Sequence, residues 1–496
     1  MKKAIMIQGT MSNAGKSLIT AGLCRVFHQD GYSVAPFKSQ NMALNSFITE
    51  EGLEMGRAQV VQAEAAGVIP SVLMNPILLK PVTDMGSQVI VNGEVRGNMK
   101  AAEYFAYKKN LVPEVMRAFN ALASRHDIIV IEGAGSPAEI NLKQNDIVNM
   151  GLAKMTDASV LLVGDIDRGG VFAQLVGTLI LLDDEERDRI KGLIINKFRG
   201  DIELLHPGLT MLEEKAGKPV IGTIPYLKVD IEDEDSLTER FSSKPSASAL
   251  DIAIIRLPKI SNFTDFMALE ASEGVGLRYI REPRELGRPD MVILPGTKNT
   301  ISDLKWLRQN GLEAAIMRLA KEGVIVFGVC GGYQMMGHCI RDKENTEGGG
   351  EISGLGLLPI STDFHSEKTR LRAAGKITGA QGALSPLNGS NVEGYEIHMG
   401  VSRFTENAAV LVTKENGDAD GCACGNVAGT YLHGFFDSAE CRTALIKALC
   451  AQKGISAPGG AFDFRAYKEE QYNKLADAVR KNLDMGFIYE ILGISR

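Results

Sequence analysis

The feature that most constrains the fold is a glycine-rich loop between an apolar segment and a helical pattern near the N-terminus. The loop, residues 9–17, reads Gly-Thr-Met-Ser-Asn-Ala-Gly-Lys-Ser. It follows the apolar residues 5–7 and precedes a helical pattern over residues 18–29. In this setting glycines let backbone N–H groups face phosphates, a lysine meets the outer phosphates, and a serine hydroxyl binds Mg²⁺. The pattern predicts a P-loop domain of the α/β class.

The loop supplies most of the predicted ATP ligands. Five residues rather than four separate Gly9 from Gly15, so the standard pattern fits only with an insertion. The alternative is a glycine-rich turn with an incidental lysine, but the strand and helix on either side favour a phosphate loop. Asn196 follows a later strand pattern, over residues 192–195, a position from which side chains often contact the nucleotide base. The predicted ATP-binding residues are Gly9, Thr10, Asn13, Gly15, Lys16, Ser17 and Asn196.

A carboxylate marks the predicted metal site. Glu132 follows the apolar strand pattern of residues 128–131. The carboxyl ends of parallel strands line the ligand crevice, and carboxylate oxygens suit Mg²⁺. We therefore expect Glu132 and Ser17 to bind Mg²⁺, the alternative being a solvated carboxylate at a strand end.

Two other strand ends carry polar segments. Lys38 ends the strand over residues 33–37 and precedes several amide side chains, which suits a carboxylate or phosphate ligand or an ordinary polar loop. Residues 164–170 offer two carboxylates and an arginine after another strand. The residues alone do not choose among metal, phosphate and substrate there.

The second half contains a candidate nucleophile. Cys330 lies within Gly-Val-Cys-Gly-Gly, directly after the strand pattern of residues 324–327. Small flanking residues allow the sharp strand-to-helix turn of a nucleophile elbow, whose next N–H, here that of Gly331, helps to bind an oxyanion. Gly296 ends the preceding strand and is the second predicted oxyanion donor. The alternative is a buried core cysteine.

Two histidines compete for the role of general base. His433 lies in Tyr-Leu-His-Gly, far from Cys330 in sequence, as a Cys/His pair allows. His398 lies in Tyr-Glu-Ile-His-Met-Gly. We expect His433 to be the partner of Cys330 and keep His398 as the competitor.

The composition excludes several classes of protein. No uninterrupted apolar run approaches the roughly 20 residues of a membrane span. The net charge is −7 without a basic block, which argues against nucleic acid as a partner. The seven cysteines are scattered and odd in number, so they do not form a disulfide framework and a cytoplasmic location is expected.

The two halves resemble two known kinds of protein. The C-terminal half resembles class I glutamine amidotransferases, and the N-terminal half resembles dethiobiotin synthetase, whose phosphate loop has the same extra residue. Together they resemble the cobyric acid synthase family of cobalamin biosynthesis. The motifs that carry this resemblance are the phosphate loop, Lys38-Ser39-Gln40-Asn41-Met42, Asn45-Ser46, Gly164-Asp165-Ile166-Asp167-Arg168-Gly169-Gly170, Asn196-Lys197-Phe198-Arg199-Gly200-Asp201, Tyr395-Glu396-Ile397-His398-Met399-Gly400 and Tyr431-Leu432-His433-Gly434.

The resemblance implies a reaction and its participants. Glutamine supplies nitrogen for ATP- and Mg²⁺-dependent amidation of several carboxylates of adenosylcobyrinic acid a,c-diamide, through acyl phosphates, to give adenosylcobyric acid. The oligomeric state stays open, with a homo-oligomer as one option. Class I enzymes usually carry Glu two residues after the catalytic His, but Phe435 stands there, which leaves open whether another group orients His433 or a Cys/His dyad works alone. The implied substrate-binding residues are Lys38, Gln40, Asn41, Asn45, Asp167 and Arg168.

The resemblance also implies a division into domains. Solid apolar strands alternating with helices predict a doubly wound parallel sheet in each half. A Ser/Ala-rich stretch after the acidic residues 230–235 predicts a linker. The expected parts are a dethiobiotin synthetase-like P-loop ATP-binding amidoligase domain over 1–240, a linker over 241–250, a class I glutamine amidotransferase-like α/β domain over 251–445, and a helical tail over 446–496.

Two alternative functions remain from the sequence. Cobyrinic acid a,c-diamide synthase has the same architecture, but the segment over residues 39–42 favours cobyric acid synthase. The other alternative is a nucleotide switch of the partition-ATPase type with a binding domain attached. Those switches carry an extra lysine early in the loop, where this chain has Met11, and a switch gives Cys330 no role.

Overall fold

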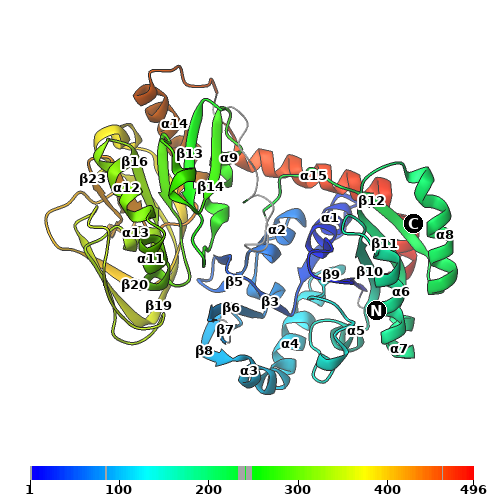
Figure 1. Ribbon diagram of the computed structural model, residues 1–496. Helices are drawn as coiled ribbons and strands as arrows, with labels where there is room; N and C mark the ends of the chain where they lie inside the picture. Colours follow the sequence, from blue (N-terminus) through cyan, green and yellow to red (C-terminus); the bar gives the residue numbers. More distant parts are fainter. Residues whose placement is uncertain (1–2, 84–85, 233–240, 242–247, 461, 496) are drawn as a thin grey trace. The chain divides into compact units, whose positions relative to one another are not determined.

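The computed structural model describes residues 3–83, 86–232, 241, 248–460 and 462–495 (Figure 1). The chain forms two compact units. Unit 1 comprises Met1–Ala43, Glu54–Glu232 and Arg465–Arg496, and unit 2 comprises Leu44–Leu53 and Asp233–Phe464. The chain therefore passes between the units more often than the expected division allows. Of the expected linker, residues 242–247 lie outside the described residues.

Unit 1 is built on a six-stranded parallel sheet, as the sequence predicted. Its strand order is β12-β11-β10-β1-β9-β2. Because β1 lies between β9 and β10, the carboxyl ends of these three strands open onto the crevice where such sheets bind ligands. The strands are β1 (Lys3–Gly9), β2 (Val34–Phe37), β9 (Ile128–Glu132), β10 (Ser159–Asp165), β11 (Ile190–Phe198) and β12 (Val220–Pro225).

Helices and a smaller sheet complete unit 1. The smaller sheet has the order β3-β6-β7-β8 and follows the segment that begins at Lys38. Its strands are β3 (Gln40–Met42), β6 (Ile77–Thr83), β7 (Gly86–Val91) and β8 (Glu94–Lys100). The helices are α1 (Lys16–Gln29), α2 (Arg57–Ala65), α3 (Ala101–Lys108), α4 (Val112–Ala123), α5 (Met150–Thr156), α6 (Val171–Leu181), α7 (Asp184–Arg189), α8 (Ile202–Ala216), α15 (Phe464–Asn482) and α16 (Met485–Ile491).

The expected tail over 446–496 does not form one separate part. Its first portion stays in unit 2, whereas α15 and α16 belong to unit 1 (Figure 1). The physical reason is an apolar stripe on α15: Leu475 and Val479 are fully buried in the same core as α1. A Cβ on Gly22 of α1 would lie 2.6 Å from Cγ2 of Val479, so this glycine permits the close approach of the two helices. At the rim, Arg25 donates to Glu469 at 2.6 Å.

Unit 2 contains a second α/β sheet, again as predicted. Its order is β14-β13-β15-β16-β24-β23, parallel except for the antiparallel edge strand β23. The strands are β13 (Leu250–Ile255), β14 (Val275–Ile280), β15 (Met291–Leu294), β16 (Ile325–Val329), β23 (Cys422–Cys424) and β24 (Val427–Thr430). The helices are α9 (Met267–Glu270), α10 (Pro283–Leu286), α11 (Thr300–Gln309), α12 (Leu312–Lys321), α13 (Gly331–Met335) and α14 (Ala439–Lys453).

A mostly antiparallel sheet lies beside this core in unit 2. Its long strands β19 and β20 pair along most of their length. The members are β17 (Cys339–Asp342), β18 (Gly350–Ser353), β19 (Ile360–Ile377), β20 (Asn391–Phe404), β21 (Val412–Lys414) and β22 (Ala419–Asp420). The short strand β4 (Ser46–Ile48) also belongs to unit 2, whereas β5 (Glu54–Gly56) belongs to unit 1.

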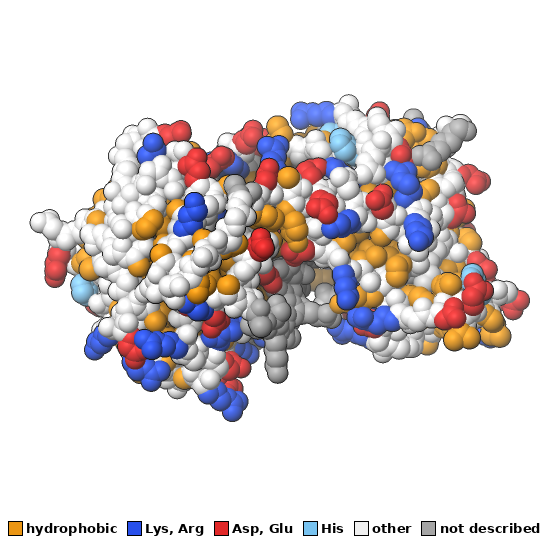
Figure 2. Space-filling model, turned by 90° about the horizontal axis from the view of Figure 1, so that it is seen from above, with side chains coloured by type: hydrophobic (Ala, Val, Ile, Leu, Met, Phe, Trp, Pro, Cys, Tyr) orange, Lys and Arg blue, Asp and Glu red, His pale blue; other side chains and the backbone are white. Residues whose placement is uncertain are grey.

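The surface drawn in Figure 2 carries side chains of both charges. On the face drawn in Figure 2, acidic and basic side chains are interspersed. Within the described residues, no helix combines the length and apolarity that a membrane crossing requires.

Leu475→Ala tests the packing of α15. Removing a fully buried leucine side chain leaves a cavity and should lower the free energy of unfolding by about 2–5 kcal/mol. Urea unfolding monitored by circular dichroism measures the loss. Lys474→Ala, one position earlier with its side chain about half exposed, is the control and should change stability by no more than about 0.5 kcal/mol. Equal stability of the two variants would contradict the packing described.

Two candidate reaction centres

The Cys330 turn has the strained geometry of a nucleophile elbow. Cys330 follows β16 and precedes α13, with φ 50° and ψ −107°. A non-glycine residue in this region is strained and is retained only where its surroundings enforce it. The neighbouring glycines are required by space: a Cβ on Gly332 would lie 1.9 Å from the Leu294 carbonyl oxygen, and one on Gly328 would lie 2.6 Å from the Tyr333 nitrogen. Cys330 is therefore presented by a turn that few other sequences could form.

His433 is the partner of Cys330. His433 is 1% exposed, and Cys330 is among the neighbouring groups that raise its pKa. The thiol of Cys330 donates to the Ile397 carbonyl at 3.6 Å. The Nδ1 atom of His433 lies 2.7 Å from Oδ2 of Asp265. Burial alone would lower the pKa of His433, but the charge and hydrogen bond of Asp265, together with Cys330, raise it to about 10. A buried imidazolium beside Cys330 can offset the charge of a thiolate, the nucleophilic form of cysteine.

Asp265 is the candidate for the group that orients His433, since Phe435 stands where class I enzymes usually carry Glu. Asp265 lies in the short helix η5 (Phe263–Phe266), far from His433 in sequence, and its other oxygen accepts from the Gly434 N–H at 3.2 Å. Phe435 instead packs in the core against Phe327, with ring centroids 5.1 Å apart. Sequence reasoning missed Asp265 because its signal, an isolated aspartate after β13, has no recognisable spacing from Cys330 or His433.

The two predicted oxyanion donors lie beside the catalytic pair. A Cβ on Gly296 would lie 3.3 Å from Cε1 of His433, and one on Gly331 would lie 2.7 Å from Cγ2 of Thr297. Gly331 is the first residue of α13, and the first N–H groups of a helix have no partner within it. Both glycines thus stand where backbone N–H groups can approach a carbonyl attacked by Cys330.

The competing histidine is engaged elsewhere. The Nδ1 atom of His398 lies 2.8 Å from the Gly400 carbonyl oxygen, and its Nε2 lies 3.3 Å from Glu396. Its ring stacks on Tyr431 with centroids 3.8 Å apart. Glu396 is also paired with Lys414 at 2.5 Å. These contacts engage both ring nitrogens of His398, so His433 remains the better candidate for the partner of Cys330.

The phosphate loop of unit 1 is closely packed. Asn13 and Gly15 have φ values of 60° and 100°. A Cβ on Gly15 would lie 2.0 Å from Nδ2 of Asn196, which donates to the Ala14 carbonyl at 2.9 Å. The structure thus brings together the first and last of the predicted ATP-binding segments. Lys16 donates within the loop, to the Met11 carbonyl at 3.0 Å.

Glu132 is buried at the centre of a hydrogen-bonded cluster of unit 1. It is 1% exposed and accepts hydrogen bonds from Ser17 at 2.8 Å and Lys38 at 2.9 Å. Gln62 of α2 donates to its other oxygen at 2.5 Å. The alternative of a solvated strand-end carboxylate is therefore wrong, and Glu132 joins the predicted metal ligand Ser17 to the predicted substrate-binding residue Lys38.

The donors around Glu132 fit Mg²⁺ shared with nucleotide phosphates. A serine hydroxyl and a carboxylate, 2.8 Å apart, are oxygen ligands of the kind that Mg²⁺ prefers. Within the residues that the structure covers, no cluster of three His, Cys, Asp or Glu side chains could hold a metal by itself. Mg²⁺ usually keeps waters and substrate phosphates in its shell, so two protein ligands suffice.

The predicted substrate-binding residues fall into three places. Lys38 is buried in the Glu132 cluster, Gln40 accepts from Tyr104 at 2.6 Å, and Asn41 donates to Gln59 at 3.0 Å, all in unit 1. Asn45 is 1% exposed but belongs to unit 2.

The third place is the end of β10, where Asp167 and Arg168 are exposed and Asp167 pairs with Arg199 at 2.8 Å. There the structure adds a residue that the sequence analysis did not select. Lys197 has φ 60° and donates to the Asn13 carbonyl at 2.8 Å and to Asp165 at 2.9 Å. It is therefore a second cation beside the phosphate loop, in addition to Lys16.

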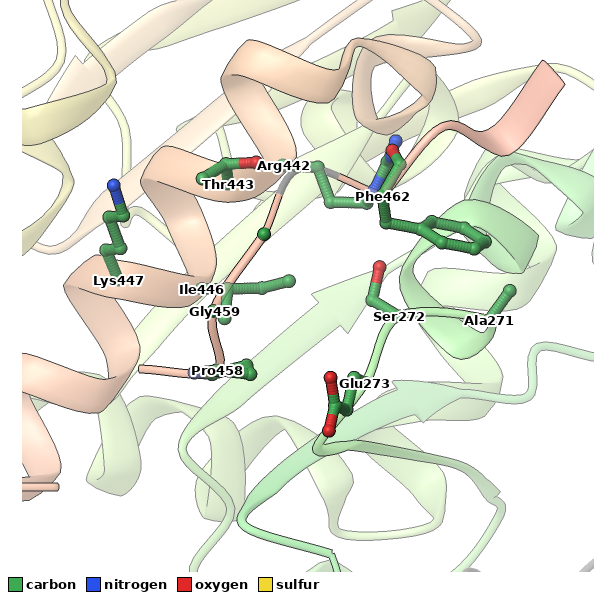
Figure 3. A pocket seen from close by; sticks show the side chains of 11 residues that line it. Ala271, Ser272, Glu273, Arg442, Thr443, Ile446, Lys447, Pro458, Gly459 and Phe462 are labelled. Carbon is green, nitrogen blue, oxygen red and sulfur yellow. The ribbon is translucent and has the colours of Figure 1, made fainter. Parts of the chain in front are cut away.

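A hollow in unit 2 lies apart from these residues. Figure 3 shows that α14 contributes Arg442, Thr443, Ile446 and Lys447 to its lining. The guanidinium of Arg442 donates to the carbonyls of Phe436 and Asp437 at 2.9 and 3.0 Å, so it is already engaged. None of the predicted site residues lines this hollow.

Comparison with known proteins agrees with the two centres. Residues 5–237 match a CobQ/CobB/MinD/ParA nucleotide binding domain, and residues 251–441 match a CobB/CobQ-like glutamine amidotransferase domain. Cobyric acid synthase from Lachnoclostridium phytofermentans is 58% identical over 99% of both chains, and that from Ruminiclostridium cellulolyticum is 56% identical over 99% of this chain and 97% of its own.

The chain belongs to the cobyric acid synthase family. Membership in this family confirms the predicted enzyme class, a glutamine-hydrolysing amidoligase, and the predicted succession of two α/β domains. It also decides against the partition-type switch. A solved glutamine amidotransferase structure aligns with 41% of this chain and 99% of its own, at 17% identity and a TM-score of 0.31.

Asp265→Asn tests the orientation of His433. The amide keeps the shape of the side chain but removes its charge and offers an N–H to Nδ1, which disfavours the tautomer that serves Cys330. Glutamate release from glutamine should fall by about 10²–10⁴-fold in kcat, by analogy with the orienting carboxylates of other triads. Glu273→Gln, an exposed position of the same unit, is the control and should retain activity. Normal hydrolysis by Asp265→Asn would mean that Cys330 and His433 act as a dyad.

The raised pKa of His433 predicts that the stability of the protein depends on pH, and Asp265→Asn tests this as well. The folded-state pKa of His433 is raised above its unfolded value of about 6.5, so its charge stabilises the fold fully below pH 6.5. This contribution is lost as the pH rises through about 10. The difference in unfolding free energy between the original protein and Asp265→Asn should therefore be largest near pH 6 and shrink towards pH 10. Chemical denaturation at several pH values measures it, and a difference that grows with pH would contradict the assignment.

Proposed function

We propose that the protein amidates several peripheral carboxylates of adenosylcobyrinic acid a,c-diamide with nitrogen from glutamine, giving adenosylcobyric acid. The observation that carries this proposal is the presence, on one chain, of a Cys330–His433–Asp265 triad and a phosphate loop joined to Glu132. One centre releases ammonia and the other activates the acceptor. The similarity to cobyric acid synthases over nearly the whole chain supports this corrinoid as the acceptor.

The proposed glutamine reaction follows from the geometry of unit 2. Cys330 attacks the side-chain carboxamide of glutamine, and the N–H groups of Gly296 and Gly331 stabilise the oxyanion. His433 passes a proton to the departing ammonia, which leaves a thioester on Cys330. Water then releases glutamate and restores the thiol. Asp265 holds the imidazole in position throughout, as its 2.7 Å contact with Nδ1 implies.

The proposed acceptor reaction takes place in unit 1. A carboxylate resists attack by ammonia because oxide is a poor leaving group, whereas an acyl phosphate releases phosphate. The corrinoid carboxylate therefore takes the outer phosphoryl group of ATP, and ammonia then displaces phosphate to form the amide. Lys16 stabilises the charge on the transferring group. Ser17 and Glu132 would hold Mg²⁺, which neutralises phosphate charge when it is bound.

The remaining participants follow from the charges of the site. Lys38, Gln40 and Asn41 offer one cation and two amides to the carboxylates of the corrinoid, and Arg168 offers an exposed cation. All seven cysteines are free, which supports a reducing compartment and hence the cytoplasm. No role for nucleic acid or membrane enters this scheme, and a homo-oligomer is compatible with it.

The direct test of the proposed function is the mass of the product. The enzyme is incubated with ATP, Mg²⁺, glutamine and adenosylcobyrinic acid a,c-diamide, and the added amides are counted by mass spectrometry. Several amides per corrinoid would support the proposal. Cobyrinic acid a,c-diamide synthase, the related activity, would instead amidate cobyrinic acid and leave the a,c-diamide unchanged.

Cys330→Ala tests the separation of the two centres. The variant should lose glutamine-dependent amidation and retain amidation with high ammonium at elevated pH, where free ammonia exists. The corrinoid product measured with each nitrogen source gives the result. Cys441→Ala, a buried cysteine on α14, is the control and should use glutamine normally. A folded Cys330→Ala protein that ammonia cannot restore would overturn the division of labour.

Lys16→Ala tests the phosphate loop. Removing the cation that faces the outer phosphates should abolish amidation with glutamine and with ammonia alike. Glutamine hydrolysis measured without ATP should survive, because its chemistry uses neither ATP nor Lys16. Lys191→Ala, an exposed lysine of the same unit, should behave normally. Full amidation by Lys16→Ala at ordinary ATP concentration would exclude this loop as the catalytic nucleotide site.

A further inference from the structure

A short segment of the N-terminal half is built into the glutaminase unit. Leu44–Leu53 belongs to unit 2, although the residues before and after it belong to unit 1. Its strand β4 is buried: Ser46 is 1% exposed and Ile48 is fully buried. Apart from Asn45, which the family resemblance implies in substrate binding, no residue of this segment has a part in the two reactions described above, so its burial within unit 2 calls for another role.

The backbone of Ser46 is fixed on both sides. Its N–H donates to Oδ1 of Asn262 at 3.0 Å, and its carbonyl accepts from the hydroxyl of Tyr395 at 2.9 Å. Nδ2 of Asn262 in turn donates to the Tyr395 hydroxyl at 3.3 Å. These three buried groups, which we name the Ser46 clamp, form a closed set of hydrogen bonds. Because unpaired buried polar groups are costly, movement of Ser46 must displace Asn262, Tyr395 or both.

One partner of Ser46 contacts His433, and the other directly precedes the helix that carries Asp265. The ring of Tyr395 stacks on His433, with centroids 5.3 Å apart and planes 21° apart. The backbones of the same two residues exchange hydrogen bonds of 3.1 and 2.9 Å. Asn262, with φ 51°, occupies the N-cap position of η5, the helix that carries Asp265, without a side-chain capping hydrogen bond. The Ser46 clamp therefore touches both the face of the His433 ring and the helix that orients it.

The segment also has a direct covalent link to the acceptor centre. The chain that enters it contains Lys38, paired with Glu132, and Asn41, bonded to Gln59. Phe47, next to Ser46, packs edge-on against Tyr395 with centroids 5.3 Å apart. A ligand that repositions residues 38–41 would pull on the segment within a few peptide bonds.

We propose that Leu44–Leu53 is a coupling segment: occupancy of the ATP-dependent centre changes the Ser46 clamp, and the clamp sets the rate of glutamine hydrolysis by positioning His433 and Asp265. Tyr395 and Asn262 are then positioning residues of the glutaminase centre. The coupling rests on the proposed function, because the ligand that shifts residues 38–41 is the corrinoid with ATP. It would restrict ammonia release to times when an acceptor is bound.

Tyr395→Phe is the sharpest test, since it removes the hydroxyl and leaves the ring that stacks on His433. In the unmodified protein, ATP, Mg²⁺ and corrinoid together should raise kcat for glutamate release several-fold. In Tyr395→Phe, kcat should fall about ten-fold, a change of about 1.4 kcal/mol that is typical of one hydrogen bond, with KM for glutamine nearly unchanged. The stimulation by acceptor should fall towards one.

Ser272→Ala is the control. The Ser272 hydroxyl also donates to a backbone carbonyl of unit 2, that of Ala268 at 2.7 Å, but it contacts neither the Ser46 clamp nor η5. It should keep both the rate and the stimulation. Ser46→Pro attacks the clamp from the other side by removing the N–H that Asn262 accepts, and it should reproduce the loss of stimulation. Glu51→Ala, exposed in the same segment, should not.

Amidation with ammonium, measured on every variant, separates the two proposals. If neither the unmodified protein nor any variant forms amides, whether from glutamine or from ammonium, the proposed function fails. If amides form from ammonium but hydrolysis shows no response to acceptor, or if Tyr395→Phe keeps the full rate and response, the coupling segment is overturned. Loss of response in Tyr395→Phe and Ser46→Pro, with ammonium-dependent amidation intact, supports it.

Discussion

The contact between His433 and Asp265 is the interaction on which the glutaminase centre depends. Both side chains are almost completely buried, so each charge would be costly without the other. Burial lowers the pKa of His433, but the charge and hydrogen bond of Asp265, whose Oδ2 lies 2.7 Å from Nδ1, raise it, together with Cys330. The strained elbow at Cys330 supplies the nucleophile, but its geometry is useful only if a charged imidazole lies beside it. The short helix η5 therefore has the role of positioning this one carboxylate.

Unit 1 is organised around a second buried carboxylate. Glu132 meets Ser17 of the phosphate loop and the ammonium of Lys38, which precedes the predicted corrinoid-binding residues. The residues proposed to bind nucleotide and acceptor thereby share one hydrogen-bonding partner. A change in the charge around Ser17 must be felt at Lys38, because removing either partner leaves a buried charge uncompensated. This arrangement suits an enzyme that must bring a phosphate and a carboxylate together.

The sequence predicted most of the fold because apolar strands buried on both faces leave few alternatives. It predicted Cys330, His433, Lys16 and Glu132 because short motifs tie them to strand ends. It could not predict Asp265, since a carboxylate brought by tertiary folding has no fixed spacing from its histidine.

For the same reason the sequence misplaced the C-terminal residues. The stripe of Leu475 and Val479 was visible, but nothing in it named α1 as its partner. The inclusion of Leu44–Leu53 in unit 2 was equally invisible, because backbone hydrogen bonds such as those of Ser46 leave no trace in side-chain identity.

The central claim is that one chain releases ammonia from glutamine at Cys330 and consumes it at an ATP-dependent centre. Isotope labelling tests it most directly. The enzyme is given ATP, Mg²⁺, the corrinoid and glutamine labelled with ¹⁵N in its amide group, in the presence of unlabelled ammonium at neutral pH, and the new amides are analysed by mass spectrometry. If Cys330 supplies the ammonia, the new amides should carry ¹⁵N in the unmodified protein and lose it in Cys330→Ala. Amides that carry the unlabelled nitrogen in both proteins would contradict it.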